Sequence, residues 1–133
     1  MSKTIKVSLD KKVSPPVLKL EHYGHAHMDK ASTPQTIVWK LHGELAQSQF
    51  TTASFLWLVT PQSGIFSTPT PNGNTLSMTD NHKDDLSDGD WPYQLSVDFN
   101  GTTYSCPPRP TADDGDKSLR TALLAKDPII INH

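Results

Sequence analysis

YQLSVDFNG, residues 93–101, is the stretch of sequence that decides the predicted fold. Its apolar residues occupy every second position, which is the period of a β-strand with one buried face. Asn100 and Gly101 follow, and this pair readily adopts the positive φ values of a two-residue hairpin turn. The stretch therefore predicts a strand over residues 93–99 and a return strand over residues 102–106.

The same period of two recurs elsewhere in the chain, in short stretches separated by eleven prolines and seven glycines. The clearest examples are Ile5, Val7 and Leu9, and then Ile37, Trp39 and Leu41. Further strands are expected within residues 17–21, 50–59, 65–66, 76–78 and 129–131. Residues 55–59 are apolar on both faces, so we expect this strand to be central, with a second sheet on one side and a loop or another subunit on the other.

Short strands with one apolar face must stack on a partner sheet. The sequence therefore predicts an all-β fold, a two-layer antiparallel β-sandwich of about seven to nine short strands. A closed barrel is the alternative. Leu119 and Leu123, spaced four apart, allow at most one short helix near residues 117–126. The length of 133 residues fits a single domain over residues 1–133.

Two features resemble the immunoglobulin-like family. Trp39 on an early strand and Tyr104-Ser105-Cys106 late in the chain are similar to the core tryptophan and the Tyr-x-Cys motif of those domains. No upstream cysteine exists to pair with Cys106, and the Tyr-x-Cys stretch follows a tight hairpin. The resemblance therefore implies the generic sandwich and no binding role.

The charge of the chain bears on whether it binds nucleic acid or membranes, and its cysteine content bears on its cellular compartment. The 12 basic and 14 acidic residues give a formal charge of −2, so nothing predicts a nucleic-acid or membrane partner. The N-terminal residues lack the apolar core of a secretory signal. Cys106 is the one cysteine, so no internal disulfide can form. We therefore expect a cytoplasmic protein.

Residues 22–30, HYGHAHMDK, raise the question of a metal site. His25 and His27 are two apart, so on a strand they point to the same side and could share one ion, with Met28 as a soft ligand. Zinc or copper would be the metal, completed by a histidine or Cys106 from elsewhere in the chain. The other interpretation is a polar loop with incidental imidazole groups and no cofactor.

Aromatic residues supply the other candidate site. Trp91 flanks the acidic loop 80–92 and, with Tyr93, could stack on a carbohydrate or a peptide; the alternative is that Trp91 anchors the start of a strand. Arg109 lies in the second candidate recognition loop, residues 107–117. No catalytic residue is predicted, because there is no Gly-x-Ser-x-Gly elbow and no spacing ties a nucleophile to a base.

These observations predict a non-enzymatic binding or structural β-sandwich module that forms a homodimer. Self-association is expected for two reasons. The strand over residues 55–59 has two apolar faces that need cover, and the strand over residues 129–131 needs a neighbour along its edge. The alternative function is a small zinc- or copper-binding protein that uses His25 and His27.

Overall fold

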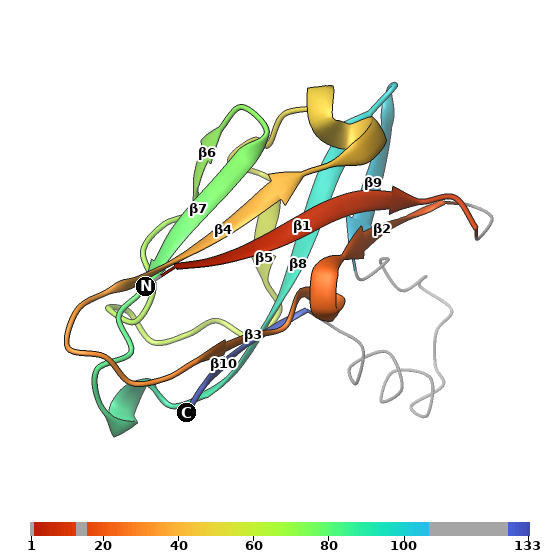
Figure 1. Ribbon diagram of the computed structural model, residues 1–133. Helices are drawn as coiled ribbons and strands as arrows, with labels where there is room; N and C mark the ends of the chain where they lie inside the picture. Colours follow the sequence, from red (N-terminus) through yellow and green to blue (C-terminus); the bar gives the residue numbers. More distant parts are fainter. Residues whose placement is uncertain (1, 13–15, 107–127) are drawn as a thin grey trace.

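Two stacked β-sheets form the protein in the computed structural model, which describes residues 2–12, 16–106 and 128–133 (Figure 1). The first sheet has, in spatial order, β2 (Val17–Leu20), β1 (Ser2–Asp10), β4 (Gln35–Leu41), β7 (Thr75–Asp80) and β6 (Thr70–Asn72). The second has β3 (Ala26–Met28), β10 (Ile129–Asn132), β8 (Gly89–Phe99) and β5 (Phe55–Trp57), and β9 (Thr102–Cys106) also pairs with β8. The helical turns among the described residues are the 3-10 turns η1 (Glu21–Gly24), η2 (Gly43–Gln47) and η3 (Asp85–Ser87). The predicted all-β sandwich is confirmed.

The predicted hairpin is present. β8 and β9 are antiparallel, with Phe99 opposite Thr102, and the turn residues Asn100 and Gly101 have φ values of 50° and 80°. Positive φ at both central positions is the geometry that Asn-Gly tolerates and that matches the twist of the flanking strands. The strand itself is longer than predicted, because it already begins at Gly89.

The core lies between the sheets and is built from the period-two positions. Alternate residues of β4, β7 and β8 are almost completely buried, since successive side chains of a strand point to opposite faces. The buried residues of these three strands include Ile37, Trp39, Leu41, Leu76, Met78, Tyr93, Leu95 and Val97. Burying one such side chain contributes about 1.5–3 kcal/mol, so this alternation is the main source of stability.

Two strand pairs are parallel, which differs from the entirely antiparallel sandwich that the sequence predicts. β1 runs parallel to β4, and β3 runs parallel to β10. After β2 the chain crosses to the second sheet to form β3, and it returns to the first sheet as β4. β4 therefore arrives beside β1 by a crossover and not by a hairpin.

The prediction of a central strand over residues 50–59 is wrong. β5 spans Phe55–Trp57 only and is an edge strand that pairs with β8. A turn precedes it, in which Ser54 N donates to Thr51 O at 3.1 Å and Thr51 N donates to Ser54 Oγ at 2.9 Å. These local bonds compete with the strand ladder, so the strand does not begin before Phe55.

The C-terminal strand is covered within the sheet. β10 lies between β3 and β8, so Ile130 and Ile131 pair on both sides, and Ile129 pairs with β8. Residues 129–131 therefore need no second subunit to pair with. The predicted helix near residues 117–126 lies outside the described residues.

Candidate functional site

The residues of the predicted metal site lie on and just before β3, and the two on the strand face opposite sides. His27 is exposed on the outer face, and the next residue, Met28, is 2% exposed and packs in the core. His25 precedes the strand, half-buried, with its ring 6.1 Å from that of Tyr23. The ring of His27 lies 5.9 Å from that of His133. The alternation of the strand therefore separates Met28 from His27.

No metal centre is assembled around these histidines in the part of the chain that the structure describes. There, no group of three or more His, Cys, Asp or Glu residues is arranged to hold an ion. His133 instead places Nε2 2.8 Å from Asp29 Oδ1, at an exposed position.

Tyr93, one of the two predicted stacking residues, is completely buried. Its hydroxyl donates to Gly24 O at 2.7 Å and accepts from Trp39 Nε1 at 2.9 Å. Burial raises the pKa of Tyr93 far above its ordinary value, so the hydroxyl stays protonated and keeps its donor role. Because Trp39 is on β4 and Tyr93 is on β8, the bond joins the two sheets.

Trp91, the other predicted stacking residue, is half-buried on β8. Its ring lies 6.3 Å from Phe66 in an edge-on arrangement, and it covers Gly89 so closely that a Cβ there would lie 3.0 Å from the indole. The structure does not bring Trp91 and Tyr93 together at the surface. Arg109 lies outside the described residues.

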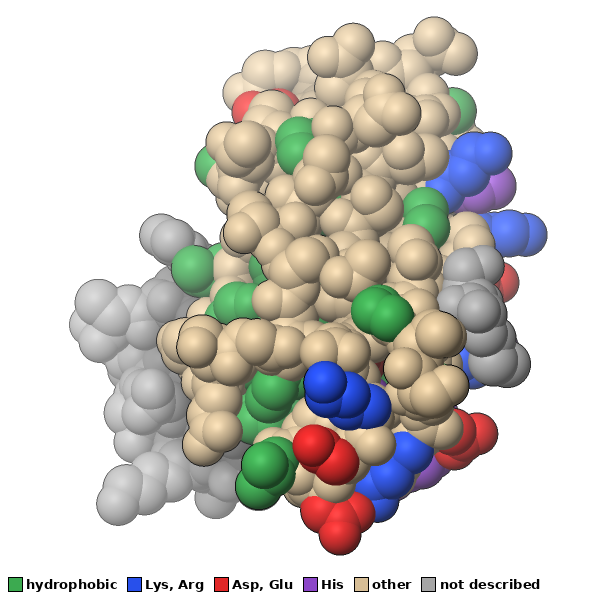
Figure 2. Space-filling model, turned by 90° about the vertical axis from the view of Figure 1, so that its left-hand side faces the viewer, with side chains coloured by type: hydrophobic (Ala, Val, Ile, Leu, Met, Phe, Trp, Pro, Cys, Tyr) green, Lys and Arg blue, Asp and Glu red, His purple; other side chains and the backbone are tan. Residues whose placement is uncertain are grey.

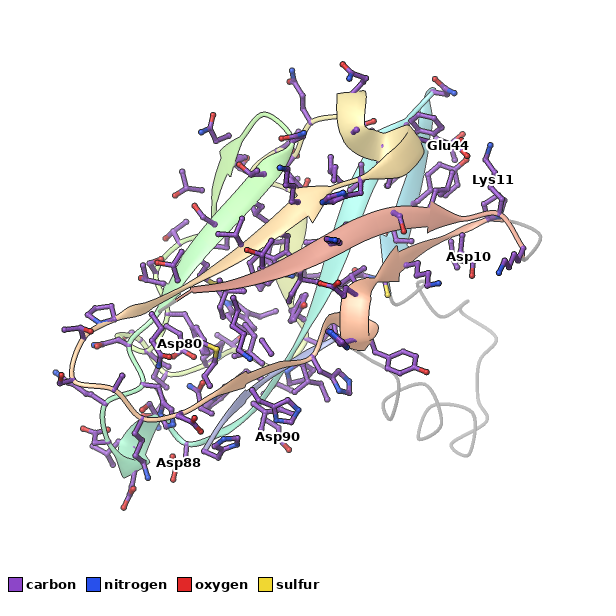
Figure 3. All side chains as sticks on the ribbon, viewed as in Figure 1. Asp10, Lys11, Glu44, Asp80, Asp88 and Asp90 are labelled. Carbon is purple, nitrogen blue, oxygen red and sulfur yellow. The ribbon has the colours of Figure 1, made fainter. Side chains whose placement is uncertain are left out.

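A buried polar pair links the sheets at the end of the sandwich where Asp80, Asp88 and Asp90 lie (Figure 3). Asp80 of β7 and Asn132 of β10 are 0% and 3% exposed, and Asn132 Nδ2 donates to Asp80 Oδ1 at 3.2 Å and to Ser87 O at 2.9 Å. Asp80 Oδ2 and Asn132 Oδ1 have no hydrogen-bond partner. Burial raises the pKa of Asp80 to about 6, although the bond from Asn132 and the nearby His82 oppose this shift.

Ser87, His82 and Asp88 are residue types of a hydrolytic triad, and they lie together beside this pair. His82 Nδ1 is 2.7 Å from Ser87 Oγ, and Nε2 is 3.5 Å from Asp88 Oδ1. However, Ser87 is 3% exposed and its hydroxyl donates to Asp84 O at 2.8 Å, while His82 Nε2 is also 2.8 Å from His133 O. A buried hydroxyl that is already engaged offers no nucleophile, and the histidine of the cluster bonds the backbone of His133 instead.

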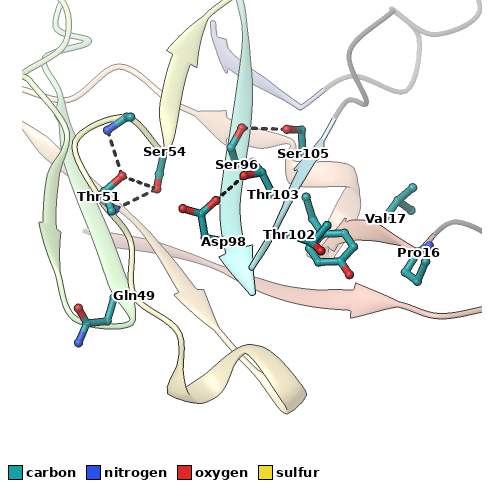
Figure 4. A pocket seen from close by; sticks show the side chains of 12 residues that line it. Pro16, Val17, Gln49, Thr51, Ser54, Ser96, Asp98, Thr102, Thr103 and Ser105 are labelled. Carbon is teal, nitrogen blue, oxygen red and sulfur yellow. Dashed lines mark hydrogen bonds between the residues drawn. The ribbon is translucent and has the colours of Figure 1, made fainter. Parts of the chain in front are cut away.

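A hollow of about 770 Å³ lies on the β8–β9 hairpin (Figure 4). It extends from the turn before β5 across the hairpin to the start of β2. Seven hydroxyl side chains and one carboxylate line it, and its described lining contains no His, Cys, Lys or Arg. The hydroxyl residues are Thr51, Ser54, Ser96, Thr102, Thr103, Tyr104 and Ser105, and the carboxylate is Asp98.

The hairpin register positions the polar groups of the hollow. Ser96 lies opposite Ser105 and Asp98 lies opposite Thr103. Ser96 Oγ and Ser105 Oγ are 2.9 Å apart, and Thr103 Oγ1 donates to Asp98 Oδ1 at 2.5 Å. The alternation that buries the apolar residues of β8 turns these polar ones outward, so they form a row of cross-strand pairs.

Sequence reasoning missed this hollow, although part of its signal was available. The Asn-Gly turn determines the pairing of residues 96–98 with residues 103–105, and so places their polar side chains on one outer face. The other wall, which includes Pro16, Val17 and Thr51, comes from distant parts of the chain and carries no sequence signal.

No protein-family model and no curated protein matches the chain. Among the described residues, no helix has both the length and the apolar character needed to cross a membrane. The chemistry of the hollow is therefore the starting point for a function.

Proposed function

We propose that the protein is a non-enzymatic binding module that takes a small, neutral, polyhydroxylated ligand, a carbohydrate, in the hydroxyl-lined hollow. The observation that supports this proposal is the lining itself, seven hydroxyls and one carboxylate around about 770 Å³. That volume lies within the range of about 300–1,000 Å³ that is usual for small-molecule sites.

The lining suits a ligand that both donates and accepts hydrogen bonds. Each serine or threonine hydroxyl provides one donor and two acceptor positions, and it rotates to match its partner. Asp98 accepts from Thr103 through Oδ1, and a carboxylate has further acceptor positions for a sugar hydroxyl in a strong, charge-assisted bond. Pro16, Val17 and Tyr104 add apolar surface for the C–H face of a sugar ring.

Binding without hydrolysis is the better interpretation of this lining. Glycoside hydrolysis ordinarily needs a pair of carboxyl groups, about 5–10 Å apart, one on each side of the bond. The described lining supplies one carboxyl group, Asp98, and no histidine or cysteine as base or nucleophile. The alternative of zinc or copper at His25 and His27 gains no support from the described residues.

The composition argues against a nucleic-acid or membrane partner and is consistent with a cytoplasmic protein. A formal charge of −2 provides no general attraction for nucleic acid or for an anionic membrane. A single cysteine, Cys106, is compatible with a reducing compartment. We therefore place the proposed module in the cytoplasm.

The test is a binding screen of the full chain against mono- and oligosaccharides, with short peptides as a second arm. Hits are measured by isothermal titration calorimetry. We expect a carbohydrate to bind and Asp98→Ala to weaken it at least about tenfold, which corresponds to about 1.4 kcal/mol. Asp90→Ala is the matched control, because Asp90 is an exposed aspartate on the same strand but outside the hollow.

The proposal fails if no carbohydrate binds, if peptides are the only ligands found, or if a carbohydrate binds equally well to the wild type and to Asp98→Ala. Thr103→Val keeps the shape of the side chain and removes the hydroxyl that bonds Asp98. A changed affinity in this variant would locate the ligand at the Asp98–Thr103 pair.

A further inference from the structure

The sequence contains no Asp, Glu, Lys, Arg or His from Leu45 to Thr79. This segment supplies β5, β6 and all of β7 except its last residue, Asp80, and so includes an edge strand of each sheet on one side of the sandwich. Figure 2 shows that side as a broad surface of uncharged side chains, with the charged groups gathered mainly at its margins. We call residues 45–79 the uncharged flank.

β5 has an open hydrogen-bonding edge on this flank. Ser96 N donates to Ser54 O at 2.8 Å, and Leu58 N donates to Pro92 O at 3.0 Å. In an antiparallel ladder alternate residues bond to the same neighbour, so the even-numbered residues of β5 face β8. The backbone N–H and C=O groups of Phe55 and Trp57 therefore point to the other side, where the described sheet has no further strand.

β5 lacks the lysine or proline that the two edge strands of the first sheet have. A lysine or a proline is one means by which natural proteins prevent an edge strand from pairing with another chain. β6 contains Pro71 and β2 contains Lys19. β5 contains neither, and the apolar side chains in and just after it are exposed: Leu56 by 50%, Leu58 by 40% and Val59 by 52%.

We propose that β5 pairs with β5 of a second copy of this chain, antiparallel and about a two-fold axis. A two-fold interface places the same surface against itself. A surface with charge of one sign would repel itself there, whereas the uncharged flank meets no such repulsion and offers no attraction to a charged partner. A second copy is thus the occupant that the charge pattern favours.

The direction of the backbone groups selects a register. When Phe55 of one copy lies opposite Trp57 of the other, each pair exchanges both of its backbone hydrogen bonds. Leu56 then faces Leu56 of the second copy as a non-hydrogen-bonded pair, with Cα atoms about 4.5 Å apart. This pairing uses the β5 edge of both copies, so pairing through β5 stops at the dimer.

The first test measures mass by light scattering and by sedimentation of the full chain. We expect twice the 14.7 kDa of one chain, and an association constant that changes little with salt, because the interface is uncharged. The double variant Leu56→Lys with Val59→Lys should weaken association at least about tenfold, because lysines on an edge strand oppose its pairing with another chain. Leu86→Lys is the matched control, since Leu86 is an 82% exposed leucine outside the uncharged flank, and it should leave the dimer unchanged.

The second test locates the contact without relying on a loss of association. Leu56→Cys should form a disulfide-linked dimer under mild oxidation, because Cα atoms about 4.5 Å apart lie within disulfide reach. Leu86→Cys is the control, and both variants retain Cys106 as background. Circular dichroism of each variant checks that the sandwich has formed.

Four results would overturn the proposal: a wild-type monomer at a concentration on the order of 1 mM, growth beyond a dimer, a dimer that survives the double lysine variant, and no specific crosslink at position 56. The inference rests on the backbone edge and apolar side chains of β5, and the carbohydrate proposal rests on the polar side chains of the hairpin, although Thr51 and Ser54 belong to both the uncharged flank and the hollow. The double lysine variant should still bind the ligand of the hollow, and Asp98→Ala should still dimerise, so failure of one proposal leaves the other standing.

Discussion

Replacing Asp80 by Asn should stabilise the protein above pH 6. Asp80 is completely buried, and burial raises the pKa of its carboxyl group from 3.8 to about 6. Its Oδ2 and the Oδ1 of Asn132 are both buried without partners. An amide at position 80 carries no charge, still accepts from Asn132 Nδ2 through its oxygen, and adds an N–H₂ group that can donate to Asn132 Oδ1.

The magnitude and sign of the effect follow from proton linkage. Because the pKa is raised in the folded state, the stability that the neutral carboxyl contributes is complete below about pH 4 and is lost as the pH rises to about 6. A difference of about two pKa units corresponds to at most about 3 kcal/mol in the free energy of unfolding. Asp80→Asn should match the wild type near pH 4 and exceed it by up to that amount at pH 7.

The assay is urea denaturation, followed by tryptophan fluorescence, at several pH values between 4 and 8. His82 is present in both proteins, so the difference between their unfolding free energies reports Asp80 together with its interaction with His82. Asp90→Asn, at an exposed aspartate, is the control and should show no pH-dependent gain. A difference that stays constant with pH, or a variant that is less stable than the wild type at pH 7, would refute the reasoning.

Three further predictions concern the core and the histidines. Tyr93→Phe should lower the free energy of unfolding by about 2–4 kcal/mol in urea denaturation, because Trp39 Nε1 and Gly24 O both lose their buried partner; a neutral result would contradict the role of the hydroxyl between the sheets. Gly24→Ala should cost about 2–4 kcal/mol in thermal or urea unfolding, since φ is +73° and a Cβ would lie 2.7 Å from Leu20 Cδ2; unchanged stability would show that the site can relax. Elemental analysis of untagged protein should find no stoichiometric zinc or copper, and one metal per chain that disappears in a His25→Ala, His27→Ala variant would instead support the metal alternative.

Local signals account for the parts of the fold that the sequence predicts well. β9 matches its predicted bounds, β4 contains the alternating residues Ile37, Trp39 and Leu41, and β8 differs only in its earlier start. Period two and the Asn-Gly turn are properties of adjacent residues, so no knowledge of distant contacts is needed to recognise them. The expected strand over residues 50–59 fails for a reason that is also local, the hydrogen bonds between Thr51 and Ser54, but hydrophobicity alone does not reveal it.

The sequence by itself determined that this chain forms short strands with one buried face, and that residues 93–106 form a hairpin. Only the tertiary structure decided which strands are neighbours, including the parallel pair β1–β4. It also decided that Asp80 meets Asn132 across 52 positions of sequence, that Pro16 and Thr51 share a hollow with the hairpin, and that β5 lies at an edge. The physical reason is that periodicity depends on the backbone geometry of successive residues, whereas these contacts depend on how the whole chain buries its apolar surface at the lowest free energy.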